Sequence, residues 1–428
     1  MPASPSTARA INDRLALRLL QQEGPLTAGQ LKQLTGLSRP TVADLVERLA
    51  AAGLIAVVGE SGEQRRGPNA RLYGIVGDRA HLAALDVRTG GVSVLVSDLL
   101  GRVLAEASVP IGGDTGTGPA VEQAVTLVER AAKEAGAPSL HTVGIGAPGL
   151  IDPATGELRD STGLPEWHRR LVIALQERLP ARVIVENETN LAALAEQREG
   201  VARDRDTFVL LWLGHGTGAA VVLDGALRRG ASGGTGEIGF LPVPGTVTLP
   251  SATDCEGGFH SLAGAAAIAE LAVGHGLVTR GQPDGPSAAT LVRRAVQAAE
   301  GRDTGAGHGA EAGHDAAGAA DREAVAGRHA APDERTASAF LDALAGRLAI
   351  GAASVTAVLD PGCVVLGGEV GRAGGQLLAA RVQERLVRMS PLRTEVRATA
   401  LGGGAVLRGA LLTARDGAQD ELFAPAPR

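Results

Sequence analysis

The sequence predicts an α/β protein with a small N-terminal helical head and a larger body of two lobes. Helix-like segments followed by two strand-like runs fill residues 1–78. Strands and helices then alternate to the end of the chain, and glycine-rich turns follow several of the strands. This alternation is typical of layered α/β domains, and 428 residues are enough for two or three of them. We therefore expect domains at residues 1–78, 79–200 and 201–428.

Composition and charge restrict the class of protein. Hydrophobic residues make up 44% of the chain and charged residues 21%, as in ordinary globular proteins. Two cysteines, Cys255 and Cys363, are too few for a disulfide framework and fit a reducing cytoplasm. The N-terminal sequence lacks the apolar run of a signal peptide, and no stretch reaches the roughly 18 uninterrupted apolar residues of a membrane span. We expect a cytoplasmic location and no membrane partner.

The charge is distributed unevenly along the chain. The net charge is −6, yet residues 1–75 hold nine Arg and Lys against six Asp and Glu, a balance of +3 that leaves −9 for the rest. A mildly basic head on an acidic body favours a nucleic-acid partner for the head alone.

The head has the pattern of a winged helix-turn-helix. A first apolar helix stops at Gly24, a second is predicted from its N-cap Thr27 to Gly36, and a third carries Pro40 in its first turn. The inward face of the third helix is predicted to consist of Val42, Leu45, Val46 and Leu49. Two strand-like runs, 54–59 and 70–77, follow and are joined by a polar segment that contains two arginines.

In such a module the third helix enters the major groove of DNA. Its leading turn would present Ser38, Arg39 and Thr41 to the bases and the backbone. Arg65 and Arg66, at the tip of the hairpin, would lie along phosphates or in the minor groove. Arg48 is predicted to be a solvated charge on the far face. The alternative is a small helical domain with no DNA role.

Three motifs of the body resemble the ROK family of repressors, open reading frames and kinases. They are "VGIGAPGLID" at 143–152, "VENETNLAALAE" at 185–196 and the long glycine-patterned segment at 212–240. The resemblance, which runs from about residue 8 to residue 415, implies an actin-like, sugar-kinase-like body of two lobes. A winged helix-turn-helix ahead of that body is the arrangement of sugar-responsive regulators such as the xylose and N-acetylglucosamine repressors, whereas the free-standing kinases of the family lack this head.

The resemblance also indicates where kinase chemistry would fail. The first phosphate-binding turn of the family's kinases has two glycines, where this chain has Arg88 and Thr89 after Asp86. Side chains there would block the close approach of a triphosphate that glycine allows. Glu188 replaces the catalytic aspartate, and a carboxylate misplaced by about 1 Å can cost roughly 100-fold in rate. We therefore expect that the chain is not an enzyme.

A sugar pocket is the second implication of the resemblance. Asn187 and Glu237 match sugar-binding positions of the family, Phe240 replaces a histidine, and His260 stands where a glutamate is expected. With Glu188 these residues would form a reshaped hydrogen-bonding set for the hydroxyls of an effector, and Phe240 could stack on a sugar face. The alternative is that they are relics with structural roles.

The family's zinc loop is altered in the segment "TDCEGGFHSLAG". Ser251, Thr253 and Gly258 stand at cysteine positions, and Cys255 with His260 does not rebuild the four ligands of a structural zinc site. We expect no metal and no cofactor. Residues 301–332 contain one branched apolar residue, Val325, and are predicted to form a disordered insert.

These features together predict a DNA-binding transcriptional regulator, a repressor that acts as a homodimer on a palindromic operator. Two heads would read half-sites spaced by whole helical turns. A sugar or sugar derivative between the lobes would change their closure, provided that it binds the two states with different affinity. Two alternatives stay open, a sugar kinase with an added DNA-binding head and a regulator that no longer responds to any sugar.

Overall fold

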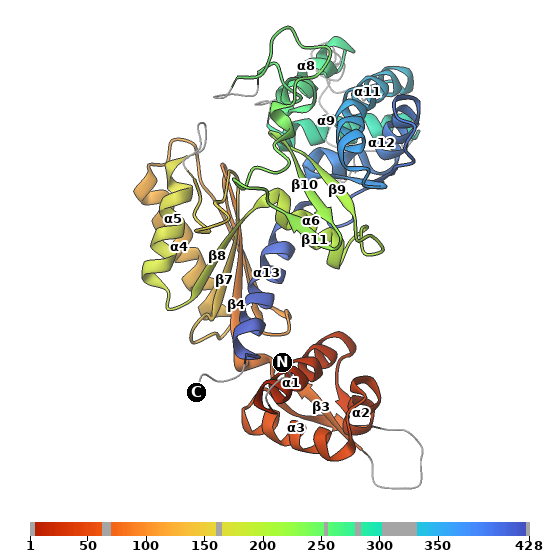
Figure 1. Ribbon diagram of the computed structural model, residues 1–428. Helices are drawn as coiled ribbons and strands as arrows, with labels where there is room; N and C mark the ends of the chain where they lie inside the picture. The colour runs from red at the N-terminus through yellow and green to blue at the C-terminus, as the bar shows by residue number, and fades with distance from the viewer. Residues whose placement is uncertain are drawn as a thin grey trace, which may run out of the picture. The chain divides into compact units, whose positions relative to one another are not determined.

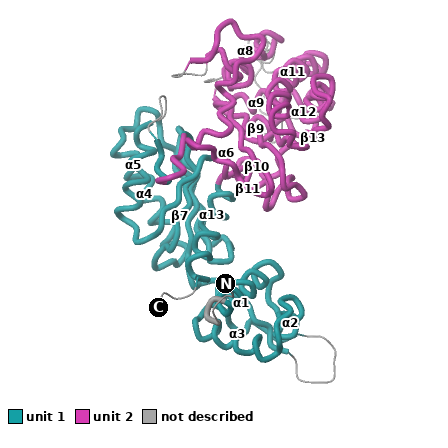
Figure 2. Tube along the Cα trace, viewed as in Figure 1, with its two compact units in different colours: residues 1–149, 156–188, 407–428 teal, residues 150–155, 189–406 magenta. Residues whose placement is uncertain are grey.

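The computed structural model describes residues 5–61, 70–159, 165–251, 256–278, 284–301 and 332–424. The predicted insert at 301–332 therefore lies almost entirely outside the described residues, as does the tip of the predicted wing. The chain forms two compact units (Figure 2). Unit 1 comprises residues 1–149, 156–188 and 407–428, and unit 2 comprises residues 150–155 and 189–406.

The head, within unit 1, has the three helices and the hairpin in the predicted order, together with a short strand between the first two helices that was not predicted (Figure 1). Its three strands form a small sheet in the order β1-β3-β2, in which both neighbouring pairs are antiparallel. Its elements are α1 (Pro5–Glu23), β1 (Leu26–Thr27), α2 (Ala28–Thr35), α3 (Arg39–Ala51), β2 (Ile55–Glu60) and β3 (Arg71–Ile75).

The rest of unit 1 is a five-stranded sheet in the order β6-β5-β4-β7-β8. The first three strands are antiparallel, and β4, β7 and β8 run parallel to one another. The strands are β4 (His81–Arg88), β5 (Gly91–Asp98), β6 (Val103–Pro110), β7 (Thr142–Ala147) and β8 (Arg182–Asn187), and the turn η1 (Gly77–Arg79) precedes them.

Helices cover both faces of this sheet. On one side lie α4 (Thr117–Glu134) and α5 (Glu166–Arg178), and on the other lies α13 (Ala405–Leu422) (Figure 1). Gly144 on β7 allows the close approach of α13, since a Cβ there would lie 2.3 Å from the carbonyl oxygen of Ala410. The C-terminal helix thus completes a lobe that is otherwise built from the first half of the chain.

Unit 2 contains a second five-stranded sheet in the order β11-β10-β9-β12-β13. Its strands are β9 (Phe208–Leu213), β10 (Thr217–Leu223), β11 (Ala226–Arg228), β12 (Cys363–Gly367) and β13 (Glu395–Ala398). Its helices are α6 (Glu188–Arg198), which begins on the last residue of unit 1, α7 (His260–Ala263), α8 (Ala265–Gly274), α9 (Gly285–Ala299), α11 (Glu334–Leu359) and α12 (Gly368–Met389). The described part of the unit also contains the short turns η2 (Ile238–Phe240) and η3 (Gly402–Gly404).

Strand β9 shows how the sequence sets the two faces of this sheet. Val209, Leu211 and Leu213 belong to a large core with α8, α9, α11 and α12, while Phe208 and Leu210 belong to a smaller core with α6. Successive side chains of a strand point to opposite faces, so an uninterrupted apolar run requires cover on both sides.

Helix α11 is long and apolar enough to span a membrane by length and composition, although half of that stretch is buried inside the protein. It contributes to the large core of unit 2, which accounts for its apolar sequence. The predicted boundary at residue 200 differs from the compact units in three respects: residues 150–155 and residues 189–200 belong to unit 2, and the chain returns to unit 1 after Val406.

Candidate nucleic-acid interface and effector residues

Local caps fix the turn between α2 and α3. Thr27 forms a capping box with Gln30: the Thr27 hydroxyl accepts from the Gln30 backbone N–H, and the Gln30 side chain accepts from the Thr27 backbone N–H. Gly36 ends α2 in the left-handed conformation, with φ of 70°. Ser38 caps α3, because its hydroxyl accepts from the Thr41 backbone N–H at 3.3 Å. The segment from Thr27 to Thr41 therefore forms a defined helix-turn-helix.

One face of α3 is buried and its leading turn is exposed. Val42, Leu45, Val46 and Leu49 are buried, as predicted from the sequence. The Ser38 and Thr41 hydroxyls lie 2.8 Å apart and bond each other, so both serve the cap. Arg39 is exposed, and no ion pair of its guanidinium is found in the described part of the chain. Among the three predicted contacts, Arg39 is the residue whose side chain stays available for DNA.

Arg65 and Arg66, the predicted wing contacts, lie outside the described residues. The strands on either side of them, β2 and β3, pair antiparallel from Ile55 and Ile75 to Glu60 and Arg71, so the hairpin itself is present. Contact of the two arginines with DNA stays a prediction.

The prediction that Arg48 is a solvated charge was wrong. Its guanidinium pairs with Asp13 of α1 at 2.6 Å and also with Asp44, one turn back on α3. Hydrogen bonding to Asp13 raises the pKa of Arg48, and this contribution outweighs that of burial. Arg48 therefore links α1 to α3 through an ion pair, whereas Arg39 is exposed at the start of α3.

An internal ion pair occupies the first turn of the body. Asp86, buried at the end of β4, accepts from both Nε and Nη2 of Arg88 at 2.9 Å. The guanidinium therefore stands at the turn where a kinase would need unobstructed backbone. On unit 2, a Cβ at Gly214 would lie 2.6 Å from Oε2 of Glu369, and a carboxylate against that turn is unfavourable for a phosphate.

Two of the predicted effector residues stand at the junction of β8 and α6. The Asn187 amide donates to the carbonyl oxygen of Gly149 at 3.0 Å, and its backbone N–H donates to Glu186 at 3.0 Å. Asn187 therefore orders the loop after β7, in addition to any ligand role. Glu188 is half-buried in the first turn of α6, where the helix dipole stabilises its charge.

The other three predicted effector residues lie together in unit 2. Glu237 directly precedes η2, Phe240 ends it, and the Phe259 backbone N–H donates to Leu241 at 2.9 Å, which places His260 beside this turn. Phe240 is 37% exposed. Glu237 is open to solvent along one side, yet the surrounding protein desolvates its carboxyl enough to raise its pKa. Among the described residues, none donates a hydrogen bond to the Glu237 carboxyl.

His215 is a candidate that the sequence did not reveal. His260 packs against Gly216 and Gly264, since a Cβ at Gly264 would lie 2.8 Å from its ring. Burial lowers the pKa of His260, and the charge of His215 lowers it further. The Ala265 backbone N–H donates to His215 at 3.2 Å, which joins the glycine-rich turn to the start of α8. The two histidines are 45 positions apart, so no local pattern could have paired them.

Metal ligands are not grouped in the described residues: no three or more His, Cys, Asp or Glu side chains converge there. Thr253 and Cys255 of the altered zinc loop lie outside the described residues. Gly258 and Phe259 are buried in the fold, with Phe259 packed against Gly351 of α11.

Comparison with known proteins matches both parts of the chain. The sequence model of the ROK family matches residues 83–416, and that of the MarR family matches residues 11–67. The DNA-binding transcriptional dual regulator NagC of Escherichia coli K12 is 28% identical over 243 residues, which are 55% of this chain and 58% of that protein. A glucokinase of Thermotoga maritima is 30% identical over 247 residues, 57% of this chain and 68% of that enzyme.

A solved structure extends the likeness to nearly the whole chain. The crystal structure of a ROK family transcriptional regulator, a homolog of the E. coli MLC protein, superposes with a TM-score of 0.70 at 20% identity and covers 97% of this chain and 98% of that chain. These matches confirm the predicted helix-turn-helix head and sugar-kinase-like body, although the chain aligns with only about 58% of the length of the first repressor-type relatives. The ROK profile covers most of the chain, from residue 83 to residue 416, and the chain belongs to the ROK family.

Proposed function

We propose that the protein is a sequence-specific DNA-binding transcriptional regulator, a repressor of carbohydrate-related genes. The observation that carries this proposal is the head. Its caps define a helix-turn-helix, and Arg39 projects from the exposed leading turn of α3 with no ion pair in the described residues. The match of the MarR family to residues 11–67 supports the same role for this segment.

Regulation rather than phosphoryl transfer is the role that the body supports. The Arg88–Asp86 pair fills the first turn, and Glu188 takes the position of the kinase base. The relationship to a glucokinase keeps the kinase as the rival function. ATP-dependent phosphorylation of a panel of hexoses is the direct test. We expect no turnover, whereas rates of about 1–100 per second would contradict the proposal.

We propose that a sugar or sugar derivative is the effector, and that unit 2 contacts it through Glu237, Phe240 and His260. A desolvated carboxyl with no bonded donor suits a sugar hydroxyl, and an exposed aromatic ring suits the apolar face of a sugar. Asn187 and Glu188 are predicted contacts on unit 1. Because an N-acetylglucosamine repressor and a xylose repressor are among the relatives similar to this chain, the ligand panel should begin with amino sugars and pentoses.

A homodimer on a palindromic operator is part of the proposal, since a two-fold protein presents two heads to two half-sites. A cytoplasmic location follows from a DNA partner.

The DNA-binding test uses a gel shift on the DNA upstream of the protein's own gene. We expect Arg39→Ala to weaken specific binding about tenfold or more, because a good arginine–guanine contact contributes about 1–3 kcal/mol. Arg18→Ala is the matched control, since Arg18 is an exposed arginine of α1 and its loss changes the charge equally. Equal weakening by both substitutions would show a merely electrostatic effect and would reject the assignment of α3.

The effector test titrates the same complex with mono- and oligosaccharides. We expect one class of sugar to change operator affinity, and Glu237→Ala to weaken that response while it leaves the affinity without sugar unchanged. If no sugar in the panel has an effect, the chain is better described as a regulator that has lost its sugar response.

A further inference from the structure

A cavity of about 440 Å³ opens in unit 1 at the amino ends of the parallel strands. Its charged residues and histidines are Asp78, Arg79, His81, His141, Arg182 and Glu421. Asp86 and Asn187, by contrast, stand at the carboxyl ends of β4 and β8. The cavity therefore lies at the opposite ends of the strands from the predicted sugar- and phosphate-related residues, and it is a separate site.

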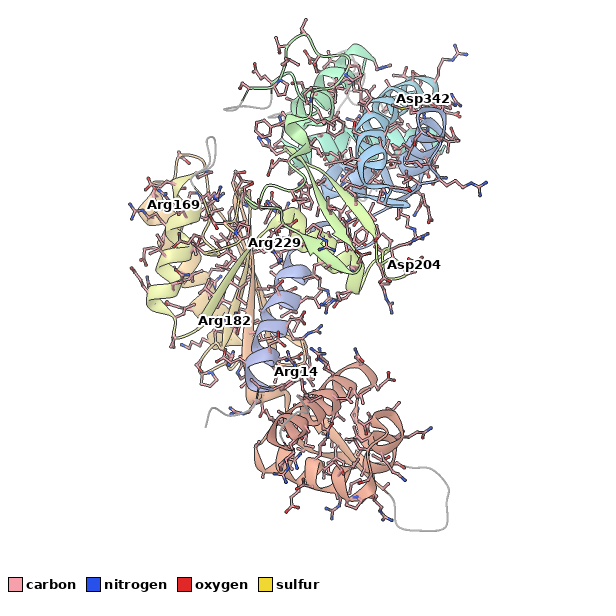
Figure 3. All side chains as sticks on the ribbon, in the orientation of Figure 1. Arg14, Arg169, Arg182, Asp204, Arg229 and Asp342 are labelled. Atoms are coloured by element: carbon pink, nitrogen blue, oxygen red, sulfur yellow. The ribbon has the colours of Figure 1, made fainter. Side chains whose placement is uncertain are left out.

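Three basic residues, His81, His141 and Arg182, form a row across the amino ends of the strands. The His141 backbone N–H donates to the His81 carbonyl at 2.8 Å, and the Arg182 backbone N–H donates to the His141 carbonyl at 3.0 Å, so the three residues stand at the amino ends of adjacent strands. Neighbouring strands are about 4.8 Å apart, which makes the row roughly 10 Å wide. Arg79 precedes His81 by two residues and extends the row. Figure 3 labels Arg182 at this end of the sheet.

The two arginines of the cavity are not neutralised by neighbours. In the described chain, neither Arg79 nor Arg182 makes an ion pair or a side-chain hydrogen bond, although Asp78 and Glu421 line the same cavity. Arg178, in the same unit, shows the contrast, since Glu122 and Glu129 lie 2.8 Å and 3.2 Å from it. Two guanidinium groups that converge on a cavity without carboxylate partners are suited to an external anion.

We propose that this cavity binds a small phosphate-bearing metabolite. The guanidinium forks of Arg79 and Arg182 match the geometry of phosphate oxygens. The His81 imidazole and Nε2 of His141, whose Nδ1 lies 2.9 Å from the Thr142 hydroxyl, supply further hydrogen bonds between them. Asp78 and Glu421 accept from hydroxyl or amino groups of the same ligand. A volume of about 440 Å³ lies within the range for small-molecule sites.

The position of the cavity couples its occupant to the head. Asp78 and Arg79 belong to η1, the turn that joins β3 of the head to β4 of the body. The Leu99 backbone N–H donates to Gly77 at 2.9 Å, which fixes this turn to the body sheet. A ligand held by Arg79 therefore contacts the connection directly, and it changes DNA affinity to the extent that it binds the free and DNA-bound states differently. This last step rests on the proposed function of the head, whereas ligand binding does not.

The test is calorimetric titration of the full chain with inorganic pyrophosphate at low salt. We expect saturable binding that the double substitution Arg79→Ala/Arg182→Ala weakens at least tenfold and Arg182→Lys weakens less, because lysine keeps the charge but loses the fork. Arg388→Ala is the control, since Arg388 is exposed at the end of α12 and unpaired in the described structure. Absence of binding by the unaltered chain, or equal binding by the double variant, would overturn the proposal.

A second comparison separates this site from the DNA-binding surface. Arg39→Ala is expected to weaken operator binding, as stated above, and to retain pyrophosphate binding. Loss of pyrophosphate binding in Arg39→Ala would place the anion on the head and would reject the cavity as the site. Failure of DNA binding alone would reject the proposed function and leave the cavity proposal intact.

Discussion

At the residue scale, two arginines of α3 differ in what surrounds them, and they should differ in what their removal does. Arg48 is 31% exposed and bonded to Asp13, whereas Arg39 is exposed and unpaired in the described residues. We expect Arg48→Ala to destabilise the head by about 0.5–1 kcal/mol and Arg39→Ala to leave its stability unchanged. Thermal unfolding of the two variants is the measurement. A larger loss for Arg39→Ala would show that the two roles have been assigned the wrong way round.

His168 on α5 should make the stability of unit 1 depend on pH. The residue is 2% exposed, and its ring lies edge to face on Trp167 with centroids 4.3 Å apart. Neither ring nitrogen has a side-chain hydrogen-bond partner in the described residues. Burial lowers its pKa to about 4, against a weaker opposite influence of the Arg88 backbone. Between about pH 6.5 and 4 the unfolded chain therefore binds a proton that the folded chain does not, so stability falls as the pH falls.

The loss approaches about 3 kcal/mol once the pH reaches 4, at roughly 1.4 kcal/mol per pKa unit. His168→Leu removes the titrating group and keeps an apolar side chain in place. The measurement is urea unfolding of both proteins at pH 7, 5.5 and 4.5. We expect the stability difference between them to change across this range in favour of the variant. A difference that is independent of pH would mean that His168 is protonated equally in both states.

Local residues of the site could be predicted from the sequence, and paired ones could not. Thr27 and Gly36 are cap residues whose role depends on neighbours within three or four positions, and both have the predicted place, whereas Ser38, predicted only as a DNA contact, caps α3. The Arg48–Asp13 pair spans 35 positions, and the burial of His168 depends on the sheet beneath α5. Such contacts follow from tertiary packing, which no local pattern encodes. Asn187 was predicted as an effector contact from the family resemblance. Its hydrogen bond to the Gly149 carbonyl is a structural role in addition to the predicted one.

At the scale of elements, one buried carboxylate joins the end of α6 to the loop after β13. Glu196 is 0% exposed and accepts from the Val201 backbone N–H at 2.9 Å, from the Leu401 backbone N–H at 3.3 Å and from the Thr399 hydroxyl. Gly200 is required beside it, since a Cβ there would lie 1.9 Å from Oε2. The carboxylate thus satisfies donors from two segments that are about 200 positions apart.

We expect Glu196→Ala to destabilise unit 2 by about 3 kcal/mol or more, because it leaves buried N–H groups without acceptors and creates a cavity. Glu199→Ala, one turn along and exposed, is the control and should change stability by no more than about 0.5 kcal/mol. Hydrogen exchange at Val201 and Leu401 reports the site itself. Unchanged protection of these two amides in Glu196→Ala would show that the carboxylate is dispensable.

The types of element could be predicted from the sequence, but the packing partner of the last helix could not. The alternation of strands and helices predicted two α/β lobes, and the apolar run of β9 fits a strand covered on both faces. The partner of α13 was not predictable, since an apolar helix stripe shows that a helix is buried but not against which sheet. The close approach of Gly144 to Ala410 is a contact between positions about 270 residues apart.

On the scale of the whole molecule, the chain crosses between the two units more than once. It enters unit 2 at Leu150, returns to unit 1 at Gly156, enters unit 2 again at Thr189 and returns for its last helix at Leu407. Unit 1 therefore cannot be completed until the end of the chain is present. This order makes the last helix, rather than the head, the segment on which the integrity of the first lobe depends.

A chain that ends at Val406 tests this dependence. It lacks nearly all of α13, and with it the buried side chains of Leu411, Leu412, Ala414 and Ala418 and the bond from Gln419 to Leu99 at 3.2 Å. The uncovered sheet face would lose apolar burial worth several kcal/mol, a large share of the stability of a typical domain. We expect limited proteolysis with mass spectrometry to show cleavage throughout β4 to β8 while peptides from β9 to β12 stay protected.

The control for this truncation is a chain that ends at Ala424, which keeps α13 and the buried Phe423. It should resist proteolysis as well as the full chain does. Protection of the first sheet in the chain ending at Val406 would mean that α13 only lies on an already stable lobe. Loss of protection in both units at once would instead show that the two units unfold together, because a lobe that folds independently would survive the loss of the other's last helix.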